Sequence, residues 1–277
     1  MNRVVPLLLA ALTVGACADP AAPALLAPEG IALIVNGSPD AANAWPAVGA
    51  LLRDRNGDGT FAADERFCTG ALISPTVVLT AAHCFDSGPE TASLRVSFDP
   101  DLRTNTQRLV VKRYALHPDY QAGNESRDTP DLAVVVLSRR VAITPMMLPA
   151  SGVLDVLQKD GALTDASFFN LGYGLDATLT GRTVYYNNFY LRMTSRSPFM
   201  ALIPSSLGLL QNQRVTGGGG TCYGDSGGPK VLDRDGYRNL VVAVMVTGDM
   251  RCRATSWNSR VDTEEARSFL RQFVALP

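Results

Sequence analysis

The stretch Gly224-Asp225-Ser226-Gly227-Gly228-Pro229 places a serine among glycines. A serine hydroxyl is a poor nucleophile until a neighbouring base takes its proton. Because glycine has no Cβ, the backbone around Ser226 can turn sharply and approach a ligand closely. The same turn can aim the N–H groups of Gly224 and Ser226 at one point, where they would stabilise a developing oxyanion. A nucleophile beside two such donors predicts acyl-transfer chemistry.

Two catalytic motifs fit this stretch, and chain order distinguishes them. Residues 224–228 also satisfy G-x-S-x-G, the nucleophile elbow of the α/β-hydrolases. That elbow needs a histidine after the serine, whereas His83 and His117, the two histidines of the chain, both precede Ser226. The α/β-hydrolase interpretation therefore lacks a base. The order His, Asp, Ser is the one that chymotrypsin-type proteases use.

Length and composition limit the fold class and the kind of partner. The chain has 277 residues, 46% of them hydrophobic, so it can bury one large core or two smaller ones. Its 24 Gly and 17 Pro, with few long helical patterns, favour a loop-rich all-β protein. The formal net charge of −1 gives no indication of nucleic acid or an acidic membrane surface as a partner.

Residues 1–17 have the pattern of an export signal. Arg3 supplies the positive start, and residues 4–14 form an apolar run that is too short to span a bilayer as a helix. Two processing sites remain open. Ala16-Cys17-Ala18 fits A-x-A cleavage, whereas residues 14–17 resemble a bacterial lipobox, which would leave Cys17 as a lipid anchor. Residues 18–33, rich in Ala and Pro, predict a pro-segment or tether.

Four further segments stand in a fixed order along the chain: C-T-G-A-L-I at 68–73, V-V-L-T-A-A-H-C at 77–84, D-L-A-V-V-V-L at 131–137, and G-D-S-G-G-P at 224–229. With Ile34-Val35-Asn36-Gly37 ahead of them, the chain from Ile34 onward resembles the trypsin/chymotrypsin family of serine proteases. The resemblance implies an all-β fold of two six-stranded antiparallel Greek-key barrels. The first barrel would occupy residues 34–149, and the second barrel, with a C-terminal helix, residues 150–277.

The resemblance also implies a serine endopeptidase that acts on protein or peptide substrates, with a triad in the crevice between the barrels. Ser226 would be the nucleophile, His83 the base and Asp131 the carboxylate that orients it. Asp128 competes with Asp131, but Asp131 directly precedes an apolar strand that would hold it rigidly. We interpret His117 as structural. The alternative function is a catalytically silent protease-fold protein that serves for binding, although the triad and oxyanion residues are all present in the sequence.

The resemblance has two further implications, for the cysteines and for Asp225. The family pattern implies the disulfides Cys68–Cys84 and Cys222–Cys252, which suit export to the extracellular space or periplasm. A buried carboxylate at Asp225 needs a cationic partner. In the family that partner is the amino group freed by cleavage before the Ile-Val pair. Cleavage between Leu33 and Ile34 would therefore activate a zymogen by pairing Ile34 with Asp225. We expect the protein to be a monomer.

The primary pocket can be placed by register from Ser226. Its base would be Gly220, its walls Gly248 and Ser256, and its mouth Tyr223. Trypsin-like members carry an aspartate where Gly220 stands, so the sequence does not indicate a preference for Arg or Lys. A pocket without a counter-charge favours uncharged side chains.

A second motif lies in the first barrel, because residues 54–65 match the twelve-position calcium loop. The triad needs no cofactor, so calcium would be structural. The ligands would be the Asp54, Asn56 and Asp58 side chains, the Thr60 carbonyl, and both carboxylate oxygens of Glu65. The flanks predict strands at 47–52 and 67–73, not EF-hand helices. The other interpretation is a polar hairpin insertion, since Asn-Gly and Asp-Gly form turns.

The tail predicts one helix over residues 262–276. Asp262 with Glu265 fits a capping arrangement, and apolar residues recur at helical spacing at 269, 270, 273 and 274. The family resemblance implies that this helix packs on the body of the protein.

Overall fold

The computed structural model describes residues 35–104, 107–123, 127–180, 183–188 and 190–277. The predicted export signal at 1–17 with Cys17, the segment 18–33 and Ile34 lie outside the described residues. Within the described ranges, no helix is long and apolar enough to cross a membrane.

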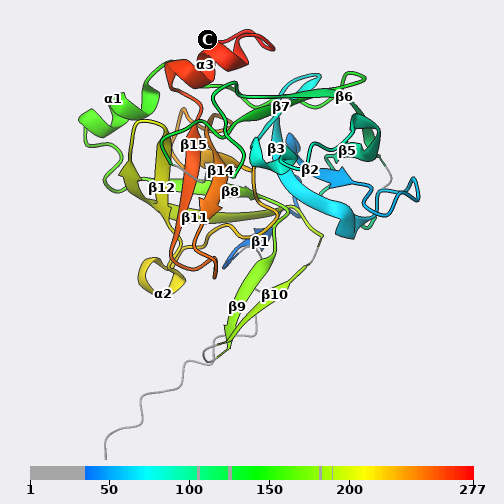
Figure 1. The fold of residues 1–277 in the computed structure, drawn as a ribbon. Helices are drawn as coiled ribbons and strands as arrows, with labels where there is room; N and C mark the ends of the chain where they lie inside the picture. The colour runs from blue at the N-terminus through cyan, green and yellow to red at the C-terminus, as the bar shows by residue number, and fades with distance from the viewer. Residues whose placement is uncertain (1–34, 105–106, 124–126, 181–182, 189) are drawn as a thin grey trace, which may run out of the picture. The chain divides into compact units, whose positions relative to one another are not determined.

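Six strands of the N-terminal half close an antiparallel barrel in the order β2-β3-β4-β7-β6-β5 (Figure 1). Its strands form from apolar, β-branched runs, and the adjacent β4 and β7 bury Val78, Leu79, Val134 and Val135 completely. The bounds are β2 Val48–Arg53, β3 Arg66–Ser74, β4 Val77–Thr80, β5 Leu94–Ser97, β6 Leu109–Leu116 and β7 Ala133–Leu137. Short 3₁₀ helices follow or precede these strands: η1 Ala63–Glu65, η2 His83–Phe85 and η3 Thr91–Ser93.

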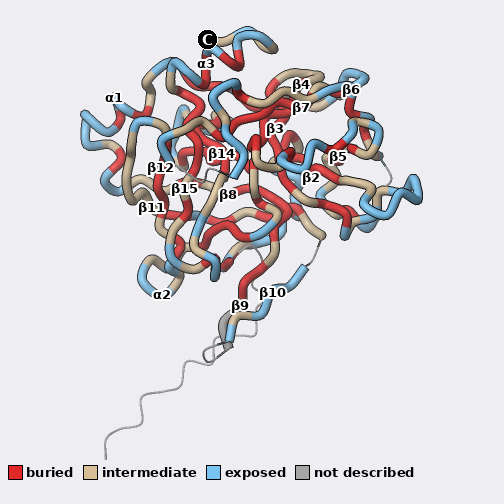
Figure 2. The backbone as a smooth tube through the Cα atoms, in the orientation of Figure 1, coloured by how far each residue is buried: buried red, intermediate tan, exposed pale blue. Residues whose placement is uncertain are grey.

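The C-terminal half forms a second antiparallel ring, β11-β12-β15-β14-β13-β8, which closes through the pairing of β8 with β11. The short β1 (Ser38–Pro39) adds to β11 from outside the ring. The bounds are β8 Ser167–Gly172, β11 Met193–Leu202, β12 Ser206–Leu210, β13 Pro229–Leu232, β14 Val241–Gly248 and β15 Thr255–Arg260. The predicted pair of six-stranded barrels is thus confirmed, and buried backbone runs through both (Figure 2).

Fully buried polar side chains of the second half bond to the first barrel. The Tyr173 hydroxyl donates to the carbonyls of Val48 and Asp99, at 3.2 and 2.7 Å. Arg192, which is 0% exposed, donates from Nε to Asp40 at 2.8 Å and from Nη1 to the Val48 carbonyl at 3.2 Å. Because a buried guanidinium without partners is costly, these bonds fix one barrel against the other.

A hairpin of two strands and two short helices lie outside the elements that the sequence predicts. The hairpin of β9 (Asp176–Thr180) and β10 (Thr183–Asn187) extends away from the second barrel (Figure 1). Helix α1 (Val153–Lys159) buries Leu154 and Leu157 at a spacing of three, and α2 (Gln213–Thr216) is a single turn.

The C-terminal helix is confirmed, but α3 (Glu264–Leu270) is shorter than the predicted 262–276. Its cap is Thr263, whose side chain accepts from the Ala266 N–H at 3.2 Å. Asp262 is not the cap, because its carboxylate accepts from Arg260 and from the Leu154 N–H. Phe269 and Leu270 are buried, so the helix packs on the core as expected.

Candidate active site

His83 and Asp131 meet because they lie at the ends of paired strands. His83 opens η2 three residues after β4, and Asp131 lies two residues before β7, which pairs with β4. The His83 Nδ1 atom lies 2.7 Å from Asp131 Oδ2. A carboxylate oxygen can only accept, so in the neutral imidazole Nδ1 carries the proton and Nε2 is the acceptor.

Backbone N–H groups hold the Asp131 carboxylate in place. Its Oδ1 accepts from the N–H groups of Ala82 and His83, at 2.6 and 3.0 Å. The Asp131 N–H donates to Ser259 Oγ of β15 at 2.9 Å, which anchors this residue to the second barrel as well. The side chain of Asp131 is 10% exposed and that of His83 is 30% exposed, so the imidazole reaches solvent while its partner does not.

His117 lies elsewhere, as predicted. It is 3% exposed, its Nε2 lies 3.2 Å from the Glu265 carbonyl oxygen, and its ring packs on Phe269 of α3. These contacts give His117 a structural place beneath the C-terminal helix.

Ser226 lies in a turn that packs against the first barrel. Gly224 and Gly227 flank it with φ of 97° and 79°, a region that favours glycine. A Cβ on Gly227 would clash with Thr80 and with the Thr69 carbonyl. The Ser226 carbonyl oxygen accepts from the Thr69 N–H at 2.8 Å and lies 4.0 Å from Cys84 Sγ, next to His83 in the chain. The turn therefore lies beside the segment that carries His83.

Two carbonyl groups orient the N–H groups of the Ser226 turn. The Tyr223 carbonyl accepts from the Leu175 N–H at 2.8 Å, and the Asp225 carbonyl accepts from the Gly228 N–H at 2.8 Å. In a trans peptide the C=O and the following N–H point in opposite directions. The N–H groups of Gly224 and Ser226 therefore point away from Leu175 and Gly228 respectively.

Asp225 is fully buried beneath this turn. Its Oδ1 accepts from the Gly174 N–H at 2.7 Å and its Oδ2 from the Cys222 N–H at 2.9 Å. A Cβ on Gly174 would clash with the carboxylate, so only glycine fits there. Burial raises the pKa of the Asp225 carboxyl, whereas the two N–H bonds and the charges of Lys230 and Arg66 oppose that shift.

Lys230, in β13, is a site residue that the sequence analysis missed. It is 0% exposed, and its Nζ donates to Asn170 Oδ1 at 2.7 Å. Burial lowers the pKa of its ammonium to about 7, and the negative charge of Asp225 opposes this shift. A lysine within the otherwise apolar strand P-K-V-L was the available signal.

The first described residues lie against the glycine run 217–220. Val35 is 1% exposed, and its carbonyl accepts from the Gly220 N–H at 2.9 Å. The Asn36 side chain donates to the carbonyls of Gly217 and Gly218, at 3.1 and 3.0 Å. The backbone that directly follows Ile34 is therefore docked on the second barrel.

Ser226 and His83 open onto two cavities that share Val246 and Thr247. The Ser226 cavity has a volume of about 320 Å³ and is formed by residues 221–223, 245–250 and Cys252. The other cavity, of about 180 Å³, contains His83 and Asp131. The imidazole and the serine thus face one continuous region of the surface.

Of the four residues predicted for the pocket, Tyr223 and Gly248 line the Ser226 cavity, whereas Gly220 and Ser256 are buried and do not line it. The Gln211 side chain fills the space next to Gly220, where any Cβ would clash with it. Thr221 Oγ1 donates to Gln211 Oε1 at 2.9 Å, and Gln211 Nε2 donates to the Thr255 carbonyl at 3.1 Å.

Both predicted disulfides, Cys68–Cys84 and Cys222–Cys252, are present. The first links β3 to η2 beside His83, and the second joins two segments of the Ser226 cavity.

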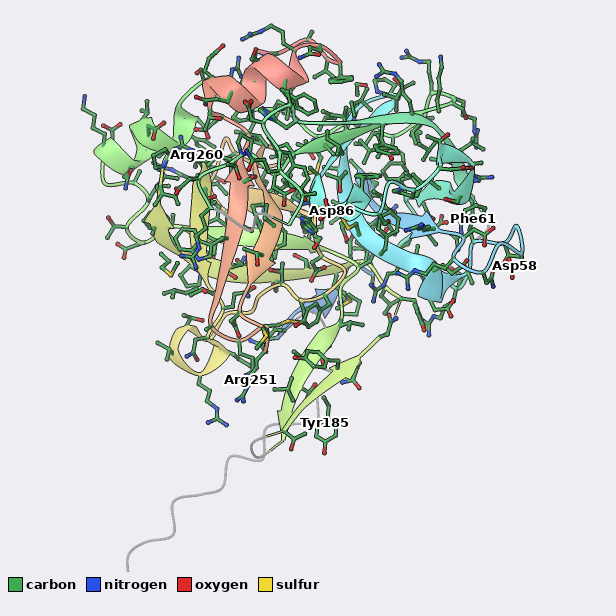
Figure 3. The ribbon with its side chains drawn as sticks, viewed as in Figure 1. Asp58, Phe61, Asp86, Tyr185, Arg251 and Arg260 are labelled. Atoms are coloured by element: carbon green, nitrogen blue, oxygen red, sulfur yellow. A yellow bond between two sulfur atoms is a disulfide. The ribbon has the colours of Figure 1, made fainter. Side chains whose placement is uncertain are left out.

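The calcium-like loop is held by its own hydrogen bonds. Asp54 accepts from the N–H groups of Gly57 and Gly59, and Glu65 accepts from those of Arg55 and Ala62. Among the described residues, the one group of three or more His, Cys, Asp or Glu ligand atoms within 4.8 Å of one another is Cys68, His83 and Cys84, whose cysteines form a disulfide. The loop carboxylates are not gathered in this way. Asp58 lies at the outer end of the loop (Figure 3). These bonds hold the loop in shape, and calcium binding there stays a prediction.

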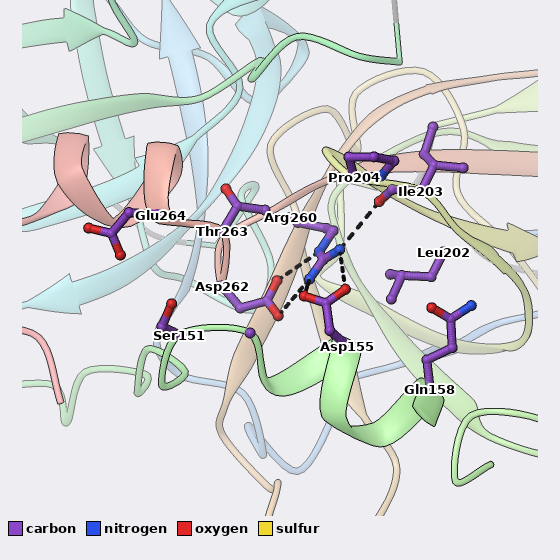
Figure 4. Close-up of a pocket in the computed structure, with 11 residues that line it drawn as sticks. Ser151, Asp155, Gln158, Leu202, Ile203, Pro204, Arg260, Asp262, Thr263 and Glu264 are labelled. Carbon is purple, nitrogen blue, oxygen red and sulfur yellow. Dashed lines mark hydrogen bonds and ion pairs between the residues drawn. The ribbon is translucent and has the colours of Figure 1, made fainter. Parts of the chain in front are cut away.

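A larger cavity, of about 490 Å³, lies between α1 and the start of α3. Its one cation, Arg260, is 3% exposed and pairs with Asp155 and Asp262 at 2.6 and 2.9 Å (Figure 4). The carbonyl of Ile203 also accepts from this guanidinium, at 3.3 Å. Arg260 is thus engaged by the protein itself and ties α1 to β15.

Comparison with known proteins supports one family. The family model described as trypsin matches residues 34–262. Serine protease snk of Drosophila melanogaster is 29% identical over 72% of this chain and 46% of its own length. Trypsin of Phaedon cochleariae is 31% identical over 61% of this chain and 66% of its own. The chain therefore spans less than half of snk and about two thirds of that trypsin.

Among solved structures, the Vibrio cholerae VesB protease matches with a TM-score of 0.62 and 21% identity, over 86% of this chain and 66% of that one. At that identity, the likeness concerns the fold.

Proposed function

The chain belongs to the trypsin family of serine endopeptidases, and we propose that it cleaves peptide bonds through Ser226, His83 and Asp131. The observation that carries this proposal is the His83–Asp131 pair, with Nδ1 and Oδ2 2.7 Å apart, beside the Ser226 cavity. Ser226 Oγ attacks the scissile carbonyl while His83 Nε2 accepts its proton. His83 then returns the proton to the leaving amine, and Asp131 stays ionised and stabilises the imidazolium. Water, activated by the same imidazole, then hydrolyses the acyl-enzyme.

The N–H groups of Gly224 and Ser226 would hold the oxyanion of the tetrahedral intermediate. The orientation of the Tyr223 and Asp225 carbonyls supports this role. Because these carbonyls accept from Leu175 and Gly228, the N–H groups that follow them point in the opposite direction. Each such donor contributes about 3–4 kcal/mol to transition-state stabilisation in known sites.

Active-site labelling tests the nucleophile. We expect a fluorophosphonate probe to label wild-type protein at Ser226, and Ser226→Ala to lose both labelling and peptide hydrolysis while its circular dichroism stays unchanged. A folded wild-type protein that resists the probe and cleaves no peptide in a library would favour the silent binding protein instead. Peptide hydrolysis by folded Ser226→Ala would contradict the nucleophile assignment.

Activation would follow cleavage between Leu33 and Ile34. The new ammonium of Ile34 would pair with Asp225, which is buried and already accepts two N–H bonds. The docking of Val35 and Asn36 on residues 217–220 supports this step, because it brings the chain that follows Ile34 to the second barrel. We expect active enzyme to begin at Ile34 on N-terminal sequencing. Full activity in protein that begins upstream would contradict the mechanism.

The substrate side chain in the Ser226 cavity would be uncharged. The side chains that line this cavity are uncharged except for Asp249, whose carboxylate accepts from the N–H groups of Arg251, Arg253 and Ala254 and is thereby fixed to its own loop. The two disulfides indicate folding in an extracellular, oxidising compartment. Mass spectrometry of the mature N-terminus would distinguish A-x-A cleavage from lipidation of Cys17.

A further inference from the structure

The exposed apolar residues of this protein are unevenly distributed. Among the described residues, eight large hydrophobic side chains are at least 41% exposed, and three of them gather at the Ser226 cavity. These three, which we call the aromatic rim, are Tyr186, Tyr223 and Met250, at 41%, 52% and 82% exposure. Clustered apolar exposure of this kind marks interaction sites, whereas single exposed apolar residues are ordinary.

Three separate segments of the chain form the rim. Its two tyrosines are hydrogen-bonded to the same carbonyl oxygen, that of Met250. The hydroxyls of Tyr186, in β10, and Tyr223, beside the Ser226 turn, each donate to the Met250 carbonyl at 2.9 Å. Their rings pack edge to face, with centroids 5.7 Å apart. Burial, with smaller contributions from Tyr223 and the charge of Asp249, raises the pKa of the Tyr186 phenol, so that hydroxyl stays protonated as a donor.

The loop that carries Met250 is tied down on both sides. The disulfide at Cys252 joins it to Cys222, and Arg253 donates to the Ala177 carbonyl of β9 at 3.3 Å. The hairpin β9–β10 is thereby linked to the rim of the cavity. In Figure 3, Tyr185 lies toward the far end of this hairpin and Arg251 lies on the side of the body that faces it.

The rim is continuous with the substrate cavity, because Tyr223 and Met250 also line the Ser226 cavity. A polypeptide with one side chain in that cavity would have its neighbouring residues beside these rings. We propose that the aromatic rim is a second substrate-binding subsite, which takes an apolar or aromatic side chain of the peptide substrate next to the residue held in the cavity. This inference rests on the proposed endopeptidase function and adds a substrate class to it.

Physical chemistry favours an apolar occupant. Tyrosine rings offer large, stiff contact surfaces at low entropic cost, and the two phenol hydroxyls are already engaged with Met250. The Asp249 carboxylate accepts the backbone N–H groups of Arg253 and Ala254, which hold it within its own loop. What remains available on the rim is apolar and aromatic area.

The test compares paired peptides that share one residue for the cavity and differ at flanking positions, with Phe or Leu in one and Ser in the other. We expect wild-type enzyme to favour the apolar peptide by about 10-fold in kcat/KM, mostly through KM, the size of one apolar contact. Tyr186→Ala should reduce this ratio several-fold, and Tyr186→Phe, which keeps the ring and loses the hydroxyl bond, should reduce it less. The control, Val215→Ala, removes a 78% exposed side chain outside the rim and should keep the wild-type ratio.

The outcomes separate this inference from the proposed function. Failure of wild-type Ser226 to react with a fluorophosphonate probe would overturn the proposed function and the rim together. Normal labelling with a ratio near one at every flanking position, or a ratio that Tyr186→Ala and Tyr223→Ala leave at the wild-type value, would overturn the rim alone. Near-ultraviolet circular dichroism of each variant shows whether it is folded, and Tyr223→Ala, which removes the other ring of the pair, keeps the rim testable if Tyr186→Ala misfolds.

Discussion

The two barrels hold their parts of the active site by different means. In the first, the Asp131 carboxylate accepts from the backbone N–H groups of Ala82 and His83, in the segments next to the paired strands β4 and β7. In the second, Ser226 lies on a glycine-rich turn over the buried Asp225, and burial shifts the pKa values of Asp225 and Lys230 toward their neutral forms. Bonds of the first kind form when one barrel closes, whereas a buried carboxylate needs compensation from elsewhere. The second barrel is therefore the half that an activation step can control.

The largest expected effect on activity comes from a substitution in the first barrel. Asp131→Asn should lower kcat by about 10⁴-fold, because the amide can donate to Nδ1 and so favours the wrong imidazole tautomer. The thermal midpoint should change little, since the side chain keeps its shape. Steady-state kinetics and circular dichroism check both statements, with Asp128→Asn as the matched control. Wild-type turnover in Asp131→Asn would remove this residue from the triad.

A substitution at Asp225, in the second barrel, should lower both the free energy of unfolding and the activity. Asp225→Asn replaces a buried carboxylate oxygen, which accepts from the Gly174 or the Cys222 N–H, with an amide donor, and an unsatisfied buried donor costs about 1–3 kcal/mol. Urea denaturation measures that loss, and the fluorophosphonate labelling rate of Ser226 measures the effect on the turn. An Asp225→Asn variant with the wild-type urea midpoint would contradict the proposed difference between the two barrels.

Lys230 makes the stability of the second half depend on pH. Burial lowers its pKa to about 7 from 10.5, so between these values the unfolded chain binds more protons than the folded chain. The free energy of unfolding contributed by this group therefore rises with pH across that window, by at most about 1.4 kcal/mol per pH unit. Lys230→Met should flatten the rise, as measured by urea denaturation between pH 7 and 9. An unchanged slope would show that another group causes it.

Gln211 should set the depth of the Ser226 cavity. It packs behind Thr221 and beside Gly220, so Gln211→Ala should extend the cavity and shift preference toward larger apolar side chains by about 10-fold. Profiling with a peptide library checks this, and Gln211→Met, which keeps the volume, is the control. An identical profile for wild type and Gln211→Ala would place the base of the cavity elsewhere.

The smallest effect is expected at the loop 54–65, where calcium binding stays a prediction. Glu65 would have to share or release its bonds from Arg55 and Ala62 to act as a ligand. We therefore expect calcium or a chelator to move the melting temperature by less than about 2 °C, the equivalent of under 1 kcal/mol in a protein of this size. A larger rise with calcium that Asp58→Asn abolishes would support a calcium site.

Local sequence pattern was sufficient for much of the fold and for the chemistry. Apolar, β-branched runs predicted the strands that flank His83 and Asp131, and the strand after Asp131 explains why this carboxylate is held rigidly. The C-terminal helix was predicted too long. Its cap could not be read from spacing, because Arg260 of β15 and the Leu154 N–H of α1 bind the Asp262 carboxylate that the capping pattern requires.

The rest depended on residues far apart in the chain. Register from Ser226 predicts Gly220 as the pocket base, but the Gln211 side chain, next to the end of β12, fills the space beside Gly220. The burial of Lys230 and the meeting of Tyr186 with Tyr223 also leave no local signature.

What the sequence by itself determined is the kind of chemistry, namely a serine, a histidine and an aspartate in a set order, with four cysteines that suit an oxidising compartment. Only the tertiary structure decided what surrounds that chemistry: the compensation of Asp225, the depth of the cavity and the aromatic rim. The physical reason is that strand periodicity and turn glycines act between neighbours in the chain. Burial, charge compensation and side-chain packing arise only when segments that are far apart in the chain pack against one another.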